Sequence, residues 1–196
     1  MDQDFVERGT LLVVSGPSGV GKTTICRKLA DRLDAFLSVS MTTRPKRPGE
    51  VDGGAYCFVT TEEFERRIEL DRVLEYARVY GGHYYGTSAE PVFEALDAGR
   101  TVILEIEIEG TLQVKRRLPE AVAVYLLAPN AGEQESRLVG RRQDSAEAMA
   151  ERLSKADGEI RYAHECGAYD HFVVNDDVEE TVQRLERIVQ QARSNQ

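Results

Sequence analysis

Residues 16–23 have the amino-acid types and the spacing of a phosphate-binding loop. Their sequence, GPSGVGKT, matches the pattern G-x-x-x-x-G-K-[ST] and lies between an apolar run that predicts a buried strand and a helical pattern that begins near Lys22. Glycines let successive backbone N–H groups turn toward phosphate oxygens, and the helix directs its positive end to the same place. We expect Lys22 to reach the terminal phosphates and the Thr23 hydroxyl to bind Mg²⁺; a plain glycine turn would not require this strand and helix around it. The residues expected to contact phosphates are Gly16, Pro17, Ser18, Gly19, Val20, Gly21, Lys22, Thr23 and Thr24.

Three glutamates occupy positions where a charged side chain needs an explanation. Glu75 lies in an otherwise apolar strand, while Glu105 and Glu107 alternate with apolar residues near the end of a predicted core strand. An ionised carboxylate only accepts hydrogen bonds, so it suits a cation, Mg²⁺-bound water or the N–H donors of a ligand. An edge strand with one solvated face explains the alternation of Glu105 and Glu107 equally well.

Basic and hydroxyl-bearing side chains gather in three further segments. Residues 38–50 combine hydroxyls with three cations and two prolines, which is typical either of a phosphate site or of a solvated basic loop. Residues 84–88 (YYGTS) offer tyrosine hydroxyls, although a turn before a capped helix is the simpler interpretation. Arg137, Arg141 and Arg152 either reach phosphates or form surface ion pairs with neighbouring glutamates.

The composition indicates one soluble domain of the α/β class. The chain has 196 residues, is 41% hydrophobic and carries a net charge of −9, which argues against general nucleic-acid binding but not against a phosphorylated small molecule. It contains no membrane-length apolar stretch and no export signal, and its three cysteines have neither disulfide nor metal spacing, so we expect a cytoplasmic location. The three histidines have no accompanying ligand set.

Strand and helix patterns alternate along the chain. Apolar runs predict strands at 10–15, 36–40, 101–108, 121–127 and 171–174. Helical patterns lie at 22–33, 88–98, 145–164 and 178–193. This alternation predicts a parallel sheet covered on both faces, with regions 41–87 and 130–160 set into it as mobile subdomains.

Taken together, these segments resemble the guanylate kinases, from about Gly9 to Asp177. The matching stretches are residues 15–23, 38–51, 74–77 (LEYA), 85–87 (YGT), 140–141 (GR) and 173–177 (VVNDD). The resemblance implies the P-loop NTPase fold, with a three-layer parallel-sheet core. It implies a single domain over 1–196, with the core at 1–40, 88–129 and 161–196, a GMP-binding region at 41–87 and a helical lid at 130–160.

The resemblance also implies an activity and roles for individual residues. The expected reaction transfers the γ-phosphoryl group of ATP to GMP or dGMP, with Mg²⁺, and gives ADP and GDP for purine recycling. The residues expected to hold the GMP phosphate or neighbouring groups are Ser40, Arg44, Arg47, Tyr56 and Tyr85. Glu75 and Glu107 would read guanine with help from Thr87, and Thr23 would hold Mg²⁺, with Glu105 acting through water. The residues expected to act on the transferring phosphate are Lys22, Arg44, Arg137, Arg141 and Arg152.

The chain departs from the family pattern at four places. Family members usually carry Asp-x-Asp where this chain has Glu105-Ile106-Glu107, and Gln-Gly where it has Glu109-Gly110. Residues 81–83 form a segment one residue longer than the family norm, and Arg142 stands where glycine is usual. Two other functions are compatible with the pattern: a catalytically inactive binding module of the same fold, and a kinase for another phosphorylated acceptor. The sequence leaves open whether the protein is a monomer or a homo-oligomer.

Overall fold

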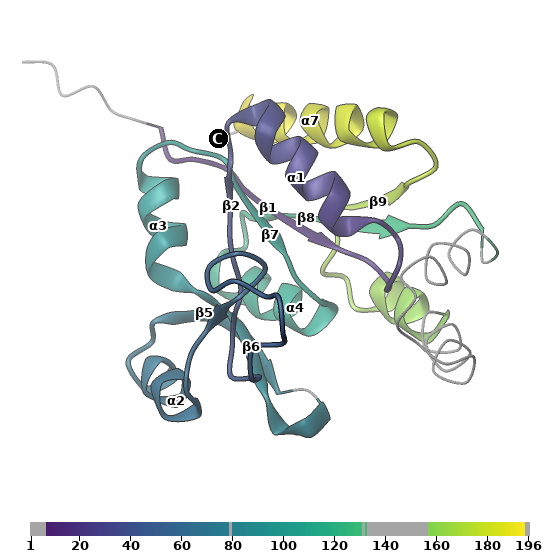
Figure 1. Cartoon of the computed structure of the whole chain (residues 1–196). Coiled ribbons are helices and arrows are strands. Elements are labelled where there is room, and N and C mark those ends of the chain that lie inside the picture. Colours follow the sequence, from purple (N-terminus) through teal and green to yellow (C-terminus); the bar gives the residue numbers. More distant parts are fainter. Residues whose placement is uncertain (1–6, 79, 131, 133–156, 195–196) are drawn as a thin grey trace, which may run out of the picture.

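A five-stranded parallel sheet carries the phosphate-binding loop. The computed structural model describes residues 7–78, 80–130, 132 and 157–194. The strand order in this sheet is β2-β7-β1-β8-β9, so β1 is central and the loop that follows it starts in the middle of the molecule (Figure 1). Its strands are β1 (Leu11–Ser15), β2 (Phe36–Leu37), β7 (Val102–Glu105), β8 (Val122–Leu127) and β9 (His171–Val174).

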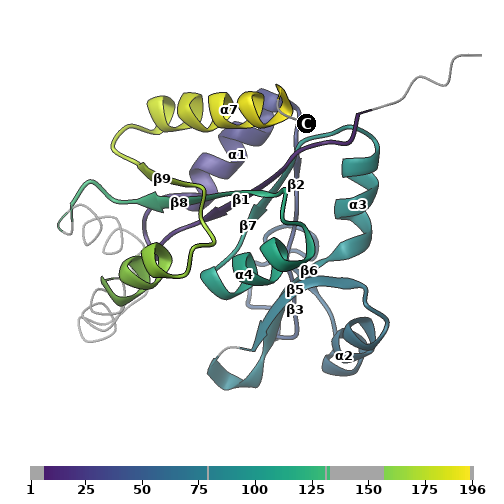
Figure 2. The same ribbon diagram turned by 180° about the vertical axis from the view of Figure 1, so that it is seen from behind.

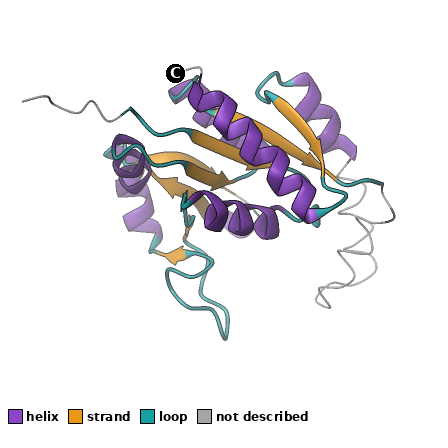
Figure 3. Cartoon of the chain, turned by 90° about the horizontal axis from the view of Figure 1, so that it is seen from above, coloured by secondary structure: helices purple, strands orange, loops and turns teal. Residues whose placement is uncertain are grey.

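Helices cover both faces of this sheet because β1 is apolar on both sides. Leu12 and Val14 pack with α1 and α7, whereas Leu11 and Val13 pack with α3 and α4. The helices are α1 (Lys22–Leu33), α7 (Val178–Ser194), α3 (Ala89–Asp97) and α4 (Ile108–Arg117). Figure 3, which looks from above, shows helices on either side of the strands. The three-layer α/β core predicted from the sequence is therefore confirmed.

A smaller, four-stranded sheet lies beside the core (Figures 1 and 2). Its order is β4-β3-β6-β5, and β6 runs antiparallel to both of its neighbours. Phe64 of helix α2 is fully buried against Met41 and Val73 of this sheet. The elements are β3 (Met41–Thr42), β4 (Cys57–Phe58), α2 (Thr61–Glu69), β5 (Val73–Arg78), the short 3₁₀ turn η1 (Tyr80–Gly82) and β6 (Tyr84–Ser88).

Two predicted strands are shorter than the apolar runs suggested. The run at 36–40 forms β2 only over Phe36–Leu37, and the chain then enters the second sheet as β3. The run at 101–108 ends as strand β7 at Glu105, and helix α4 begins at Ile108. The prediction that both Glu105 and Glu107 lie on a strand was wrong for Glu107, because its carbonyl accepts the first backbone hydrogen bond of α4, from Thr111.

The sequence prediction missed helices α2 and α4. A local signal for α2 was present: the side chain of Thr60 caps the helix by accepting a hydrogen bond from the backbone of Glu63, the T-x-x-E spacing of a capping box. The predicted helices at 22–33, 88–98 and 178–193 are confirmed to within two residues at each end. Of the pattern at 145–164, residues 157–164 are helical and the remainder lies outside the described residues. No described helix has the length and apolar character needed to cross a membrane.

Candidate active site

The phosphate-binding loop has positive φ angles at three glycines, a conformation that residues with a side chain rarely adopt. The angles are 152° at Gly16, 82° at Gly19 and 100° at Gly21. A Cβ on Gly16 would lie 2.6 Å from the carbonyl oxygen of Leu126, and a Cβ on Gly21 would lie 2.7 Å from Nδ2 of Asn175. Because helix α1 begins directly after Gly21, its unpaired N-terminal N–H groups face the loop. The loop is therefore built to hold an anion.

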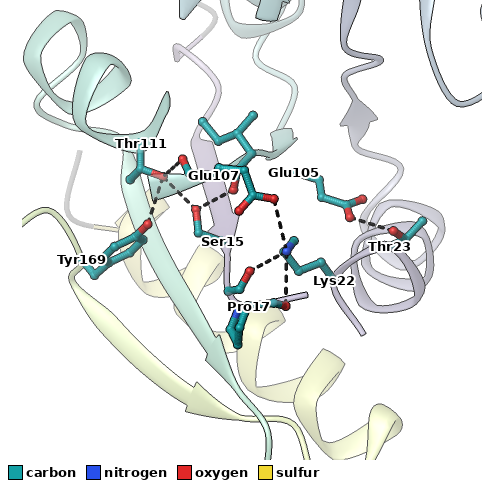
Figure 4. A network of polar contacts seen from close by, with 10 residues as sticks. Ser15, Pro17, Lys22, Thr23, Glu105, Glu107, Thr111 and Tyr169 are labelled. Atoms are coloured by element: carbon teal, nitrogen blue, oxygen red, sulfur yellow. Dashed lines mark hydrogen bonds and ion pairs between the residues drawn. The ribbon is translucent and has the colours of Figure 1, made fainter. Parts of the chain in front are cut away.

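The last two side chains of the loop, those of Lys22 and Thr23, each meet a glutamate at or just after the end of β7 (Figure 4). Nζ of Lys22 donates to the carbonyl oxygens of Gly16 and Pro17 and lies 3.6 Å from Oε1 of Glu107. Strand β7 pairs in parallel with β1, so the carboxyl ends of the two strands meet at one edge of the sheet. This register brings Glu105 close enough for Thr23 Oγ1 to donate a 2.7 Å hydrogen bond to its Oε1.

Thr23 and Glu105 are the residues that fit a magnesium ion. A hydroxyl and a carboxylate are oxygen ligands of the kind that Mg²⁺ prefers, and the ion commonly takes its remaining ligands from water and substrate phosphates. Within the described part of the chain, no group of three or more His, Cys, Asp or Glu residues could hold a metal by itself. A metal held by Thr23 and Glu105 would therefore take its remaining ligands from water or from substrate phosphates.

Three neighbouring cavities surround this carboxylate pair. The first, of about 230 Å³, lies over the phosphate-binding loop, and the second, of about 250 Å³, extends along α1 to Arg27. The third, of about 320 Å³, reaches Glu75 and is here named the Glu75 cavity. Tyr56, Glu105 and Glu107 line all three cavities. Groups bound at the loop and in the Glu75 cavity would therefore meet beside the same three side chains.

Glu75 is the buried acid of the site. Only 5% of the residue is exposed, and the burial raises the pKa of its carboxyl to about 7 despite hydrogen bonds from Thr87 that lower it. The Thr87 hydroxyl donates at 2.6 Å to Oε1. On the other side, a Cβ on Gly110 would lie 2.5 Å from Oε2, so the first turn of α4 closes on the carboxylate only because residue 110 has no side chain.

Arg44 is held rigidly beside the tyrosines that border the Glu75 cavity. Its two terminal nitrogens donate to the two oxygens of Glu50 at 3.0 and 2.8 Å, and its Nε donates to the hydroxyl of Tyr85 at 3.2 Å. The guanidinium also lies over the ring of Tyr56, 5.7 Å from its centroid. The ion pair raises the pKa of Arg44 and lowers the pKa of Glu50.

The structure brings most of the predicted acceptor-site residues together. Ser40, Tyr56, Glu75, Tyr85 and Glu107 line the Glu75 cavity. Thr87 lies behind Glu75, and Arg44 is joined to the cavity through Tyr85.

Two other predicted site residues, Arg47 and Thr24, do not line these cavities. Arg47 is exposed; its backbone N–H donates to Glu50, and its side chain lines none of the three cavities. Thr24 is exposed on the first turn of α1 and also lines none of them. The predicted site residues Arg137, Arg141 and Arg152 lie outside the described residues, as does Arg142, where the chain departs from the family pattern.

The sequence analysis did not identify three residues that support or line the site: Asn175, Gly110 and Arg27. Asn175 Nδ2 donates to the carbonyl of Val20 at 2.7 Å, so it supports the phosphate-binding loop. Gly110 makes room for Glu75, and Arg27 lines the cavity along α1 with Thr23. For Arg27 a signal was available, because it stands four residues after Thr23 and therefore on the same helix face. For Asn175 and Gly110 the relevant partner is too distant in sequence to be identified from local spacing.

The fold and this site define a P-loop NTPase that has a second ligand cavity beside its phosphate-binding loop. The model of the guanylate kinase family matches residues 8–192, and the chain belongs to this family. It is 51% identical over 185 residues to the guanylate kinase of Lactococcus lactis, with 94% of this chain and 88% of the relative covered. It is 50% identical over 186 residues to the guanylate kinase of Streptococcus pyogenes serotype M3, covering 94% and 86%. A solved guanylate kinase structure from Anaplasma phagocytophilum superposes with a TM-score of 0.73 at 32% identity, covering 94% of this chain and 86% of that one.

Proposed function

We propose that this protein transfers the γ-phosphoryl group of ATP to GMP or dGMP, giving ADP together with GDP or dGDP. The observation that carries the proposal is the continuity of the phosphate-binding loop with the Glu75 cavity, since Tyr56, Glu105 and Glu107 line both. A donor phosphate at the loop and an acceptor phosphate near Tyr56 would be adjacent. Family membership supports the same reaction.

Lys22 and the loop backbone are suited to the donor triphosphate. The Lys22 ammonium lies at the mouth of the loop, with 12% of its side chain exposed, where it would neutralise charge on the terminal phosphates. We infer that Thr23 and Glu105 hold Mg²⁺, Glu105 through water, since their oxygens suit that ion. When bound, the ion would offset the negative charge of the donor phosphates.

Arg44 is suited to bind the acceptor phosphate because its neighbours fix it in place. A guanidinium has five N–H donors, and the hydrogen bonds to Glu50, Pro45 and Tyr85 use four of them. The remaining N–H and the Tyr85 hydroxyl would bind phosphate oxygens with little loss of side-chain entropy. We infer that Ser40, Tyr56 and the exposed Arg47 complete this phosphate site.

Glu75 is suited to read the base. Guanine presents N1–H and N2–H₂ donors on its pairing edge, whereas adenine presents an N1 acceptor there. An ionised Glu75 accepts hydrogen bonds and cannot donate them, so it would favour guanine and disfavour adenine. We infer that Glu107, which lines the same cavity, assists in this recognition.

The transfer itself needs no general base from the protein. The acceptor phosphate has a second pKa of about 6, so its attacking oxygen is mostly ionised at neutral pH. A bond forms between this oxygen and the γ-phosphorus while the bond from the γ-phosphorus to the bridging oxygen of ADP breaks. Consistent with this, His83, His164 and His171 line none of the three cavities, and the ring of His164 stacks on Phe172.

Family membership also supports inferences about the remainder of the chain. We infer that Arg137, Arg141 and Arg152 lie on a lid over residues 130–160 and act on the transferring phosphate. We also infer that residues 41–87 form the GMP-binding region, that the other residues form the core, and that the protein acts in the cytoplasm.

One assay across acceptors tests the proposal. ADP formation is measured in a coupled assay with ATP and Mg²⁺ and with GMP, dGMP, AMP, CMP, UMP or IMP as the acceptor. We expect GMP and dGMP to be preferred, and we expect Lys22→Ala to reduce turnover by orders of magnitude in a folded protein. Because the Lys22→Ala variant is purified in the same way, any ADP formation that remains with it also sets an upper limit on activity from contaminating kinases.

The outcome of this assay also separates the alternatives. A wild-type protein that binds GMP but forms no ADP would support the inactive binding module. A preference for another acceptor would move the reaction to a different phosphorylated substrate. Neither is favoured now, because Lys22, Thr23, Arg44 and Glu75 are all retained.

A further inference from the structure

A chain of three hydroxyl groups lies behind the turn that carries Glu105 and Glu107 (Figure 4). The hydroxyl of Tyr169 donates to Thr111 Oγ1 at 3.3 Å, and Thr111 Oγ1 lies 2.8 Å from Ser15 Oγ. Ser15 Oγ donates to the carbonyl oxygen of Ile106 at 2.7 Å. Ser15 and Thr111 are fully buried. None of these groups has a part in the reaction described above.

The proton count gives this chain a direction. Each hydroxyl has one proton to donate, and Ser15 uses its proton on the carbonyl of Ile106. In the contact between Ser15 and Thr111, Thr111 must therefore be the donor. Burial raises the pKa of Tyr169 to about 12, so its phenol keeps its proton and donates to Thr111. The chain runs from Tyr169 through Thr111 and Ser15 to Ile106.

The chain ends on the peptide between the two carboxylates of the site. The carbonyl of Ile106 lies between Glu105, which meets Thr23, and Glu107, which meets Lys22. Thr111 Oγ1 also lies 3.2 Å from the carbonyl of Glu107, which is the more distant acceptor for its proton. Because Thr111 uses its one proton on Ser15, the hydroxyls hold the backbone on the N-terminal side of Glu107, at the carbonyl of Ile106.

Glu107 itself has few other restraints. Its side chain is 72% exposed, and the one ion pair that it forms with another described residue is the 3.6 Å contact with Lys22. A side chain held so weakly at its tip takes its position from the backbone that carries it. That backbone is the turn from strand β7 to helix α4, which the hydroxyl chain secures to the end of β1 through Ser15 and to the segment before β9 through Tyr169.

We propose that Thr111 is a positioning residue that sets the affinity for the guanine nucleotide by fixing the turn from which Glu107 enters the Glu75 cavity. This rests on the proposed function, since it takes GMP as the ligand of that cavity. Thr111 stands in the middle of the chain, so the loss of its hydroxyl disconnects Tyr169 from Ser15 and leaves Ser15 without its donor. Only the hydrogen bond from Ser15, which would no longer be oriented by a donor of its own, would then hold the turn, while the phosphate-binding loop keeps its own supports.

Thr111→Val tests the proposal because valine keeps the shape of threonine and removes the hydroxyl. Thr111→Ser keeps the hydroxyl and loses the methyl group, so it should restore the wild-type behaviour. Thr101→Val is the matched control: Thr101 is buried just before strand β7, and its hydroxyl has no hydrogen-bond partner among the described residues. Tyr169→Phe removes only the outer donor and serves as the second variant if Thr111→Val does not fold.

For each protein, the Kd for GMP is measured by calorimetry, and the KM values for GMP and ATP are measured at saturating co-substrate. We expect Thr111→Val to raise the Kd and KM for GMP about fivefold, the effect of one ordinary hydrogen bond, with the KM for ATP unchanged. Tyr169→Phe should cause a smaller shift in the same direction, and Thr101→Val should cause none.

Equal changes in both KM values, an unchanged Kd for GMP, or a failure of Thr111→Ser to restore it would overturn the proposal. A change in Mg²⁺ dependence without a change in GMP affinity would also overturn it, because the chain would then position Glu105 instead of Glu107. A wild-type protein that neither binds nor phosphorylates GMP would overturn the proposed function itself, a result seen before any variant is compared.

Discussion

The hydroxyl of Thr87 donates a 2.6 Å hydrogen bond to Oε1 of Glu75, and both residues are at least 95% buried. Burial disfavours the ionised carboxylate, whereas this hydrogen bond favours it. The net result is a pKa of about 7 for Glu75, near the pH at which the protein would work. Thr87 therefore helps to keep Glu75 in the acceptor-only form that guanine requires.

The loss of the Thr87 hydroxyl should shift the pH dependence of GMP binding. Thr87→Val removes a donor that favours the carboxylate, so the pKa of Glu75 should rise further. We expect weaker GMP binding at pH 7 and recovery toward the wild-type affinity at higher pH. Kd values for GMP between about pH 6 and pH 9 measure this, and profiles of wild type and variant that coincide over this range would contradict it.

Glu75 should also leave a signature in the stability of the ligand-free protein. Its pKa is raised from the ordinary 4.5 to about 7 in the folded state, so the folded state binds the proton more tightly than the unfolded chain does. This contribution is fully present below pH 4.5 and is lost as the pH rises through about 7. Glu75→Gln removes it. As the pH rises over this window, the wild type should lose up to about 3 kcal/mol in free energy of unfolding relative to the variant. Urea unfolding at several pH values measures the difference, and a constant difference would exclude the raised pKa.

Gly110 should determine whether Glu75 can occupy its place. Gly110→Ala puts a methyl group 2.5 Å from the present position of Oε2, so the carboxylate must move. We expect a rise of about tenfold or more in the KM for GMP, with little change in the KM for ATP. A double-mutant cycle with Glu75→Ala provides the control: once the carboxylate is gone, the added methyl group should cost little. Additive effects would mean that Gly110 acts elsewhere.

Substitutions of Arg44 and of Arg47 should have similar effects on the KM for GMP but different effects on the stability of the protein. Hydrogen bonds to a charged group contribute roughly 1.5–3 kcal/mol, so Arg44→Met and Arg47→Met should each raise the KM for GMP by about tenfold or more. Only Arg44→Met should also lower the Tm, because Arg44 is bonded to Glu50 and Tyr85 while Arg47 is exposed. Arg44→Lys, which keeps the charge without the planar fork, should restore little. If these substitutions changed the KM for ATP and not the KM for GMP, the two nucleotide sites would be assigned the wrong way round.

The parts of the site that could be predicted from the sequence are those encoded by local spacing. The phosphate-binding loop is one continuous segment, and the parallel pairing of β1 with β7 agrees with the alternation of strand and helix patterns along the chain. Glu75 could also be identified from its neighbours in the sequence, because a charged residue in an otherwise apolar strand is expected to be buried, and a buried charge requires a partner. Thr60 and Glu63 show that a missed helix, α2, also carried a readable local signal.

The parts that could not be predicted depend on contacts between distant segments. Nothing near Gly110 in the sequence indicates that its missing side chain makes room for Glu75. The end of β7 at Glu105 was missed because the apolar alternation continues to Ile108, although the backbone has already turned into α4. The bidentate pairing of Arg44 with Glu50 likewise depends on how their loop folds back on itself.

Asn175 offers the sharpest test of how the phosphate-binding loop is supported. Its Nδ2 donates to the carbonyl of Val20 at 2.7 Å, and its Oδ1 accepts from Thr181 at 3.1 Å, so the amide joins the loop to the start of α7. Asn175→Ala removes both bonds and should lower the free energy of unfolding by about 1–3 kcal/mol while raising the KM for ATP more than that for GMP. Asn175→Asp has the same shape and can still accept from Thr181, but it turns a carboxylate oxygen toward the Val20 carbonyl and adds negative charge beside the loop. It should therefore impair ATP binding more than alanine does. Calorimetric titration with ATP ranks the three proteins, and an aspartate variant that binds ATP as well as the wild type would mean that the loop keeps its shape without this amide.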